Sequence, residues 1–165
     1  MLAGDENVGK SSLIRRFVDE HFSESYIPTL GFQIYAKKLE IGKYSVALQI
    51  WDVAGQGSFE FARKTYYPHS QGFLLVFDLT NPTSFQNLDR WVAEIRGVCP
   101  NIPFVLVGNK SDLTRAIISP EEVAKKSKKL KASCNILTSA MKGVKVNEAF
   151  DLLGRAMLAA QHFVL

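Results

Sequence analysis

The stretch GDENVGKS, residues Gly4–Ser11, decides the fold of this chain, because it fits the pattern GxxxxGK[ST]. Its glycines allow backbone conformations that a side chain would forbid, so several N–H groups can point at one phosphate chain. The helix that follows contributes the positive end of its dipole. The stretch therefore predicts a phosphate-binding loop between a strand that ends at Ala3 and a helix over Lys10 to Glu20.

Each part of this loop has a predicted task. Lys10 reaches the outer phosphates as a point charge, and the Ser11 hydroxyl is a ligand for Mg²⁺. The predicted contacts to the nucleotide from this segment come from Asn7, Val8, Gly9, Lys10, Ser11 and Ser12. Alone, the motif indicates only a nucleoside triphosphate, so a kinase or an ATPase remains possible.

The bulk composition predicts one soluble globular domain over residues 1–165. No apolar run reaches the roughly 18 residues of a membrane span, and no signal segment opens the chain. Cys99 and Cys134 fit no metal spacing, which favours a reducing, cytoplasmic compartment, or the cytosolic face of a membrane. We expect a monomer.

The net charge of +4 has much of its excess in KKSKKLK, Lys125–Lys131. The stretch is either the solvated face of a helix or a contact for anionic lipid or an acidic partner. Without aromatic interleaving or a nucleic-acid motif, it does not predict nucleic-acid binding.

Apolar strands alternate with amphipathic helices along the chain, which is typical of a mostly parallel sheet covered on both faces. The predicted strands are Phe32 to Ile41, Tyr44 to Trp51, Gly72 to Leu79, Ile102 to Val107 and Asn135 to Leu137, besides Met1 to Ala3. Helices are predicted from near Pro82 to near Gly97, from Pro120 with Ser119 and Glu122 as a capping box, and from Val146 to Gln161.

The predicted fold class is α/β, a three-layer P-loop NTPase fold. Its six-stranded, mostly parallel sheet has one antiparallel edge strand, from the hairpin at Gly42-Lys43, and about five helices. A central strand of three residues is short, so we expect the chain to start inside its first strand.

Three further motifs narrow the ligand. Asp52 in WDVAGQ ends a strand, where a carboxylate can hold the metal, and Gly55 can offer its N–H to a terminal phosphate. In NKSD, Asn109–Asp112, the carboxylate of Asp112 can accept from the N1–H and the 2-amino group of guanine, a paired donor edge that adenine lacks. TSAMK, Thr138–Lys142, places a backbone N–H for the guanine O6.

These four motifs, in one order across nearly the whole chain, resemble the Ras superfamily of small GTPases. Each motif alone is equally compatible with an ordinary turn, but the four together are not. The stretches YIPTLGF, WDVAGQ, TYYPHSQG and FDLTNPTSFQNLDRWVAEI resemble Rab segments in particular.

The resemblance implies how the base is held. Phe22 matches the aromatic that packs against the guanine, and Lys110 matches the lysine that lies along the base and supports the phosphate loop. Ser139 and Ala140, followed by Met141, match the last motif, in which the alanine N–H reads O6.

The resemblance also implies the chemistry. Gln56 matches the glutamine that orients the attacking water, and with Lys10 and Gly55 it makes the expected catalytic set. Thr29 matches the threonine that binds Mg²⁺ by its hydroxyl and the γ-phosphate by its N–H. The implied metal ligands are Ser11, Thr29 and Asp52.

Hydrolysis of GTP would then release the loops at about 23–34 and 54–67, through which effectors, exchange factors and activating proteins bind. Four aromatic residues lie in the second loop: Phe59, Phe61, Tyr66 and Tyr67. They either pack beneath the loop or form a partner surface that depends on the bound nucleotide.

The chain departs from the family pattern at Glu6, where Rab proteins usually carry a small residue and Ras proteins a glycine. Its carboxylate either faces solvent or slows hydrolysis and obstructs an arginine finger. Gly57 and Ser58 replace more polar residues after Gln56, which predicts a more mobile loop.

Two other departures concern partners. Ile34 occupies a position where Rab proteins commonly have an aromatic residue, and Phe32 lies two positions earlier, which weakens any transfer of effector preference. The tail AAQHFVL holds no cysteine for prenylation, so either a lipidated tail is missing from this sequence or the protein does not use that membrane anchor.

The sequence therefore leaves three functions to be compared. The favoured one is a Mg²⁺-dependent GTP-hydrolysing switch. The alternative is a guanine-nucleotide-dependent interaction module with little hydrolysis, and an adenine-nucleotide kinase or ATPase is disfavoured by Asp112.

Overall fold

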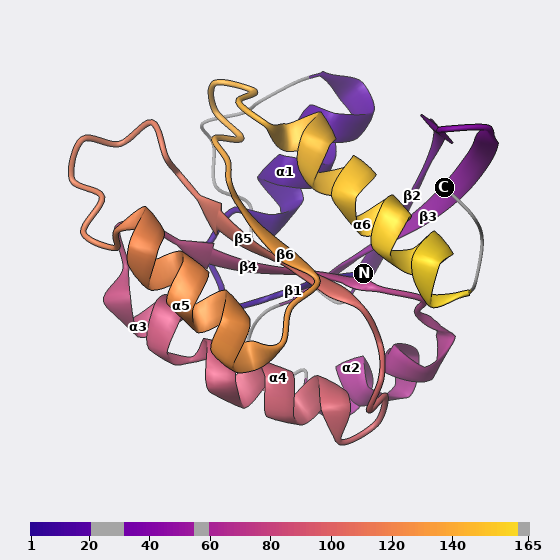
Figure 1. The fold of residues 1–165 in the computed structure, drawn as a ribbon, viewed down its shortest axis with the longest axis horizontal. Coiled ribbons are helices and arrows are strands. Elements are labelled where there is room, and N and C mark those ends of the chain that lie inside the picture. The colour runs from indigo at the N-terminus through magenta and orange to yellow at the C-terminus, as the bar shows by residue number, and fades with distance from the viewer. Residues whose placement is uncertain (21–31, 55–59, 162–165) are drawn as a thin grey trace.

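The computed structural model describes residues 1–20, 32–54 and 60–161 of the 165-residue chain. They form three layers, in which helices cover both faces of one six-stranded sheet (Figure 1). The strands are β1 (Leu2–Ala3), β2 (Phe32–Ile41), β3 (Tyr44–Val53), β4 (Phe73–Asp78), β5 (Phe104–Asn109) and β6 (Cys134–Leu137). The order is β2-β3-β1-β4-β5-β6, with β2 antiparallel to β3 and the other neighbours parallel, which confirms the predicted fold class.

The helices of the described residues are α1 (Lys10–Asp19), α2 (Glu60–Tyr66), the 3-10 helix η2 (Tyr67–His69), α3 (Pro82–Gln86), α4 (Leu88–Arg96), α5 (Pro120–Leu130) and α6 (Val146–Ala160). Helices α1 and α6 cover one face of the sheet, and α2 to α5 cover the other (Figure 1). Each face therefore has its own apolar core, with the strands between them.

The central strands confirm the pattern expected of a sheet buried on both faces. All six residues of β4 and all six of β5 are buried. On α1, the predicted apolar face of Leu13, Ile14 and Phe17 is buried, and the Phe17 ring stacks on Phe150 of α6 with ring centroids 3.9 Å apart. This stack fixes α1 against α6 above the sheet.

The predicted single helix from Pro82 to Gly97 is wrong in one respect, because it consists of α3 and α4 with Asn87 between them. Asn81 caps the first helix by accepting from the backbone N–H groups of Thr83 and Ser84, at 3.0 and 3.3 Å. The Asn87 side chain donates to Asp5 in the phosphate loop. A tertiary contact thus occupies the junction that the sequence pattern reads as continuous.

The prediction of a loop through 54–67 is also wrong in part, because α2 occupies Glu60–Tyr66 and leads into η2. Residues 55–59 lie outside the described residues. Seven residues form a helix too short to be stable alone, so its stability comes from packing against α4.

Helix α5 begins as predicted. The Ser119 hydroxyl accepts from the Glu122 N–H, and the Glu122 carboxylate accepts from the Ser119 N–H at 2.8 Å, which completes the capping box. Of its lysines, Lys126 and Lys129 both donate to Asp89 on α4. The other lysines of the stretch, Lys125, Lys128 and Lys131, are exposed, as expected for the solvated face of a helix.

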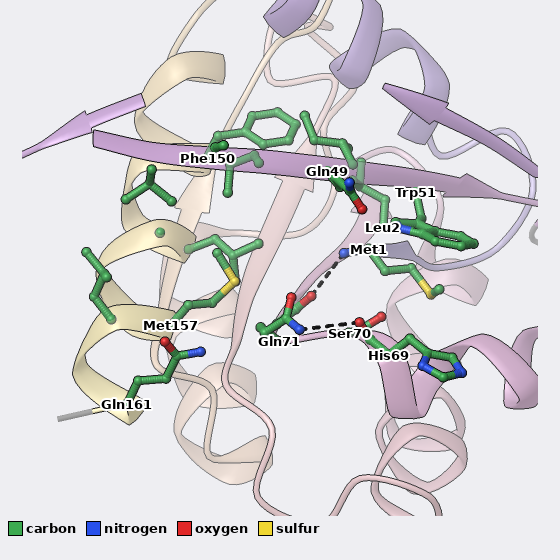
Figure 2. A pocket seen from close by; sticks show the side chains of 18 residues that line it. Met1, Leu2, Gln49, Trp51, His69, Ser70, Gln71, Phe150, Met157 and Gln161 are labelled. Atoms are coloured by element: carbon green, nitrogen blue, oxygen red, sulfur yellow. Dashed lines mark hydrogen bonds between the residues drawn. The ribbon is translucent and has the colours of Figure 1, made fainter. Parts of the chain in front are cut away.

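A cavity of about 600 Å³ lies beside the sheet, between residues 46–51 of β3, residues 69–72 and α6 (Figure 2). Phe150, Leu153 and Met157 of α6 give it an apolar wall. The amino group of Met1 donates to the Gly72 carbonyl at 3.0 Å at its edge. The cavity lies at the opposite end of the strands from the phosphate loop. No helix of the described residues has the length and apolar character needed to cross a membrane.

Candidate nucleotide-binding site

The predicted site residues that the structure describes lie together at the carboxyl ends of the parallel strands. The phosphate loop follows β1, Asp52 lies near the end of β3, and Asn109 ends β5. Ser139 follows β6. In open α/β sheets this edge is where ligands bind, so the topology brings residues from four separate motifs to one place.

The phosphate loop needs glycine at both of its ends. Gly4 has φ +136°, and a Cβ built on it would lie 2.1 Å from the Val76 carbonyl oxygen. Gly9 has φ +97°, and its Cβ would lie 2.3 Å from the Asn109 side-chain nitrogen. Gly9 is also the N-cap of α1, where no side chain caps the helix. The first-turn N–H groups are thus not occupied by a capping side chain, as an anion site requires.

Lys10 lies across this loop. Its ammonium donates to the carbonyl oxygens of Gly4 and Asp5, at 2.9 and 2.6 Å. Burial lowers the pKa of Lys10 to about 8, and the negative charges of Asp52 and Asp5 oppose that shift. A buried cation held by two loop carbonyls is therefore placed beside the one carboxylate predicted to hold a metal.

Asn109 connects the phosphate loop to the last motif. Its side-chain amide donates to the Val8 carbonyl at 3.0 Å. Its side-chain oxygen accepts from the Thr138 hydroxyl and from the Ala140 N–H, both at 3.2 Å. One buried side chain thus joins the segments predicted for the phosphates and for the base.

Asp112 is held from the same motif, because the Ser139 hydroxyl donates to its carboxylate and itself accepts from the Lys142 N–H. Lys110 forms an ion pair with Asp78, at the end of β4, with 2.7 Å between nitrogen and oxygen. The prediction gave the support of the phosphate loop to Lys110, whereas the hydrogen bond from this motif to the loop comes from Asn109.

Two connections to the site were missed by sequence reasoning. Arg16 of α1 donates to the carbonyls of Ala140 and Met141, at 2.9 and 2.8 Å. The carboxylate of Asp5 accepts from Asn87 and from the Trp91 indole N–H, both at 2.7 Å. The four-residue spacing of Asn87 and Trp91, which places them on one helix face, was the available signal.

Several predicted residues lie outside the described residues, namely Phe22, Thr29, Gly55 and Gln56. Ser11 and Ser12 lie in the first turn of α1 and are half-buried. Asp52 is 1% exposed. The structure therefore places the described residues predicted for the phosphates and for the base at one edge of the sheet, and every assignment of a residue to the nucleotide or the metal stays a prediction.

The described aromatic residues of the second predicted loop divide between the two interpretations, and Phe59 lies outside the described residues. Tyr67 is buried and packs beneath, whereas Phe61 is 87% exposed. The Tyr66 ring contacts the rings of Trp51 and Phe32 at a tilt, with ring centroids 5.3 and 5.0 Å apart. Phe32 is itself 45% exposed and Ile34 50% exposed, so the outer face of this cluster is apolar.

A glycine loop between strand and helix, at the carboxyl edge of a mostly parallel sheet, defines the P-loop nucleoside triphosphatases. Comparison with known proteins narrows the class. The family model described as "Ras family" matches residues 1–159. The chain belongs to this family of small GTPases, which hydrolyse GTP, and within it the chain is Rab-like.

The relatives cover most of the chain. Ras-related protein Rab-1D of Dictyostelium discoideum is 38% identical over 156 residues, which are 94% of this chain and 76% of that protein. Ras-related protein RABA1b of Arabidopsis thaliana is 38% identical over 151 residues, 91% of this chain and 70% of that protein. Ras-related protein Rab-1A of Dictyostelium discoideum is also 38% identical over 151 residues, with 91% and 75% covered.

Proposed function

We propose that the site described above binds GTP and GDP through this chain's own phosphate loop and base motifs. The observation that carries the proposal is the Asn109 side chain, which bonds Val8 on one side and Ala140 and Thr138 on the other. A ligand that has both phosphates and a base would meet both ends of this network. Regulators and effectors would then act on this chain according to which nucleotide the site holds.

Guanine selection is assigned to Asp112. The Ser139 hydroxyl orients its carboxylate, and an oriented carboxylate can accept from the two neighbouring donors of guanine. The backbone N–H of Ala140 is the proposed partner of O6, with Ser139, Met141 and Lys110 around the base.

The proposed metal is Mg²⁺. Ser11 and Asp52, with Thr29 outside the described residues, offer the oxygen ligands that this cation prefers. Among the described residues, no group of three or more carboxylate, imidazole or thiol side chains gathers to form a metal site. Three oxygen ligands from the protein fit a metal ion such as Mg²⁺, which fills its remaining coordination positions with water molecules and phosphate oxygens. When bound, the ion neutralises phosphate charge.

In hydrolysis, the chain contributes position and charge. Lys10, held by the carbonyls of Gly4 and Asp5, places its ammonium against the outer phosphates. Gln56 and Gly55 are proposed to orient the attacking water and the terminal phosphate. The Glu6 side chain is exposed in the phosphate loop, and its charge is among those that raise the pKa of Lys10. The alternative of a module with little hydrolysis stays a prediction, which single-turnover hydrolysis by the wild type and Glu6→Gly tests.

The cellular role is proposed from the relatives. Their Rab names favour a role in membrane traffic, on the cytosolic face of a membrane and with the chain itself a monomer. The apolar cluster of Phe32, Trp51 and Tyr66 is a candidate surface for an effector.

The test compares GDP, GTP and ATP binding by the purified chain with Mg²⁺ and with EDTA. We expect GDP and GTP to bind about a hundredfold or more tighter than ATP, because a mismatched base leaves Asp112 unpaired. Asp112→Asn should weaken GTP and improve binding of xanthosine triphosphate, whose 2-oxo group accepts a hydrogen bond. Asp151→Asn, the same change on the exposed side of α6, is the control. Unchanged guanine preference in Asp112→Asn would contradict the assigned role.

A further inference from the structure

Trp91 on α4 contacts two parts of the molecule that the sequence keeps far apart. It is 1% exposed. Its indole N–H donates to the Asp5 carboxylate at 2.7 Å, and the Arg63 guanidinium lies over its ring at 4.5 Å from the centroid. Asp5 belongs to the phosphate loop and Arg63 to α2. The rigid indole ring of Trp91 therefore lies between these two segments and contacts both.

On the phosphate side, the contact reaches Lys10. The Asp5 carboxylate accepts from Trp91 with one oxygen and from Asn87 with the other, each at 2.7 Å. A carboxylate held at both oxygens leaves its residue little freedom to rotate. The main-chain carbonyl of the same residue accepts from the Lys10 ammonium at 2.6 Å. A shift of α4 would therefore move Asp5, and with it the Lys10 ammonium that is proposed to contact the outer phosphates.

On the other side, the contact reaches the residue before Gly55. Arg63 donates to both oxygens of Glu94, each at 3.2 Å, and to the Ala54 carbonyl at 3.3 Å. The side chains of Arg63 and Glu94 are 3% and 7% exposed, so water screens this pair little. Tyr67 adds a third hydrogen bond to Glu94 at 2.6 Å.

The bond from Arg63 to Ala54 brings together the two ends of a ten-residue stretch that contains Gly55 and Gln56. Tying the ends of a segment lowers the number of conformations its interior can take, whatever its detailed path. The Arg63 guanidinium, in turn, is kept in place by Glu94 and by the face of Trp91, since a cation over an aromatic ring is favoured.

We propose that Trp91 is a positioning residue for GTP hydrolysis, which couples the phosphate loop through Asp5 to the ends of the Gln56 segment through Arg63. The inference rests on the proposed nucleotide site. Neither the Asp5 carboxylate nor Arg63 is among the groups assigned to the nucleotide, so their loss alters alignment more than affinity. The expected signature is a lower hydrolysis rate with nearly unchanged GDP affinity.

The first variant is Trp91→Phe, which keeps an aromatic face for Arg63 and removes the indole N–H. A lost hydrogen bond to a carboxylate predicts a single-turnover hydrolysis rate about tenfold lower. The dissociation constant for GDP should change by no more than about threefold, since alignment and not binding is affected. Thermal unfolding, followed by circular dichroism, reports how far the smaller ring disturbs the core.

The second variant is Asp5→Asn, which leaves the core intact. Its matched control is Asp89→Asn, the same change two positions before Trp91 on α4, where the carboxylate faces Lys126 and Lys129. Asp5→Asn should lower hydrolysis and Asp89→Asn should not. In the Trp91→Phe background, Asp5→Asn should add much less than it does alone, because the bond it weakens is already gone.

A readout without nucleotide turnover separates this inference from the proposed function. Hydrogen exchange of the backbone amides of residues 60–67 should be several-fold faster in Asp5→Asn than in the wild type, because Trp91 contacts both Asp5 and Arg63 of α2. A local structural role of Asp5 would leave those amides unchanged. If the wild type fails to bind guanine nucleotide, the proposed function is wrong, while this exchange still tests the coupling.

Two results would overturn the inference. One is a wild-type hydrolysis rate in both Trp91→Phe and Asp5→Asn, together with unchanged exchange over residues 60–67. The other is full additivity of the two changes, with hydrolysis, GDP affinity and stability all reduced in proportion, which is the result of a merely structural tryptophan.

Discussion

At the scale of single residues, the approach of Gly9 to Asn109 leaves no room for a side chain at position 9. The backbone of Gly9 lies in the left-handed region, and the Asn109 amide nitrogen occupies the space where a Cβ would be. Because that amide also holds Val8, a side chain at position 9 displaces the group that joins the two halves of the site.

Gly9→Ala should therefore weaken GDP and GTP binding about tenfold or more, from about 1–2 kcal/mol of backbone strain and the displaced Asn109. The measurement is the dissociation constant of a fluorescent GDP analogue. Gly42→Ala is the matched control, since Gly42 has φ +59° in the β2–β3 turn and no atom within 4 Å of its Cβ. It should lower stability by a similar backbone cost and leave affinity as it was. Equal affinities in wild type and Gly9→Ala would contradict the prediction.

Residue by residue, the sequence predicted groups whose chemistry is local to a motif. Asn109 and Asp112 could be named because four ordered motifs define them. The use of the Asp5 carboxylate could not be predicted, because its partners Asn87 and Trp91 lie more than 80 positions away, at the start of α4 and within it. An acidic residue in a loop is not part of a periodic sequence pattern, so nothing near it in the sequence indicates such a partner.

At the scale of elements, α2 and η2 are held to α4 by Glu94, which bonds both Arg63 and Tyr67. Burial raises the pKa of Tyr67 above its ordinary value of 10, and the hydrogen bond to Glu94 raises it further. The folded protein thus keeps this phenol protonated at a pH where the unfolded chain would lose the proton. The stability it contributes is complete below pH 10 and decreases as the pH rises above that value.

Tyr67→Phe should lower the free energy of unfolding by about 1 kcal/mol at pH 7, through the lost hydrogen bond. The gap between wild type and variant should narrow as the pH rises above 10, because only the wild type has this phenol to titrate. Denaturant unfolding at pH 7, 9, 10 and 11 measures both effects. A gap that stays constant over this range would show that Tyr67 does not titrate as inferred.

The elements that the sequence predicted are those whose signals are local. The capping box of α5, the β2–β3 hairpin and the buried runs of β4 and β5 each follow from a few adjacent residues. The helix α2 and the junction at Asn87 were not predicted, because each depends on contacts made with another element. Packing, not propensity, decides such short helices.

At the scale of the whole molecule, α1 connects the two ends of the nucleotide site. Its first turn follows the phosphate loop, and Arg16 in its last turns holds the carbonyls of Ala140 and Met141. The Phe17–Phe150 stack fixes the helix against α6. The predicted base motif is thereby supported by the same helix that begins at the phosphate loop.

Arg16→Ala should speed GDP dissociation about three- to tenfold, because two charge-assisted hydrogen bonds to the base motif are lost while the sheet is untouched. Arg15→Ala, which removes the same charge one position earlier, is the control and should leave the rate within about twofold. Stopped-flow release of a fluorescent GDP analogue measures both. Equal rates for the two variants would indicate that Arg16 acts only through its charge.

Helix α1 also fixes the distance between the phosphate loop and the base motif. Between Gly9 and Arg16 the helix advances roughly 10 Å, at about 1.5 Å per residue, and it cannot stretch. One residue inserted between them would carry the arginine about 100° around the axis, away from the carbonyls of Ala140 and Met141. Insertions should therefore be tolerated in the exposed turn around residues 114–117 but not between Gly9 and Arg16, where the helix must keep its spacing for Arg16 to reach these two carbonyls.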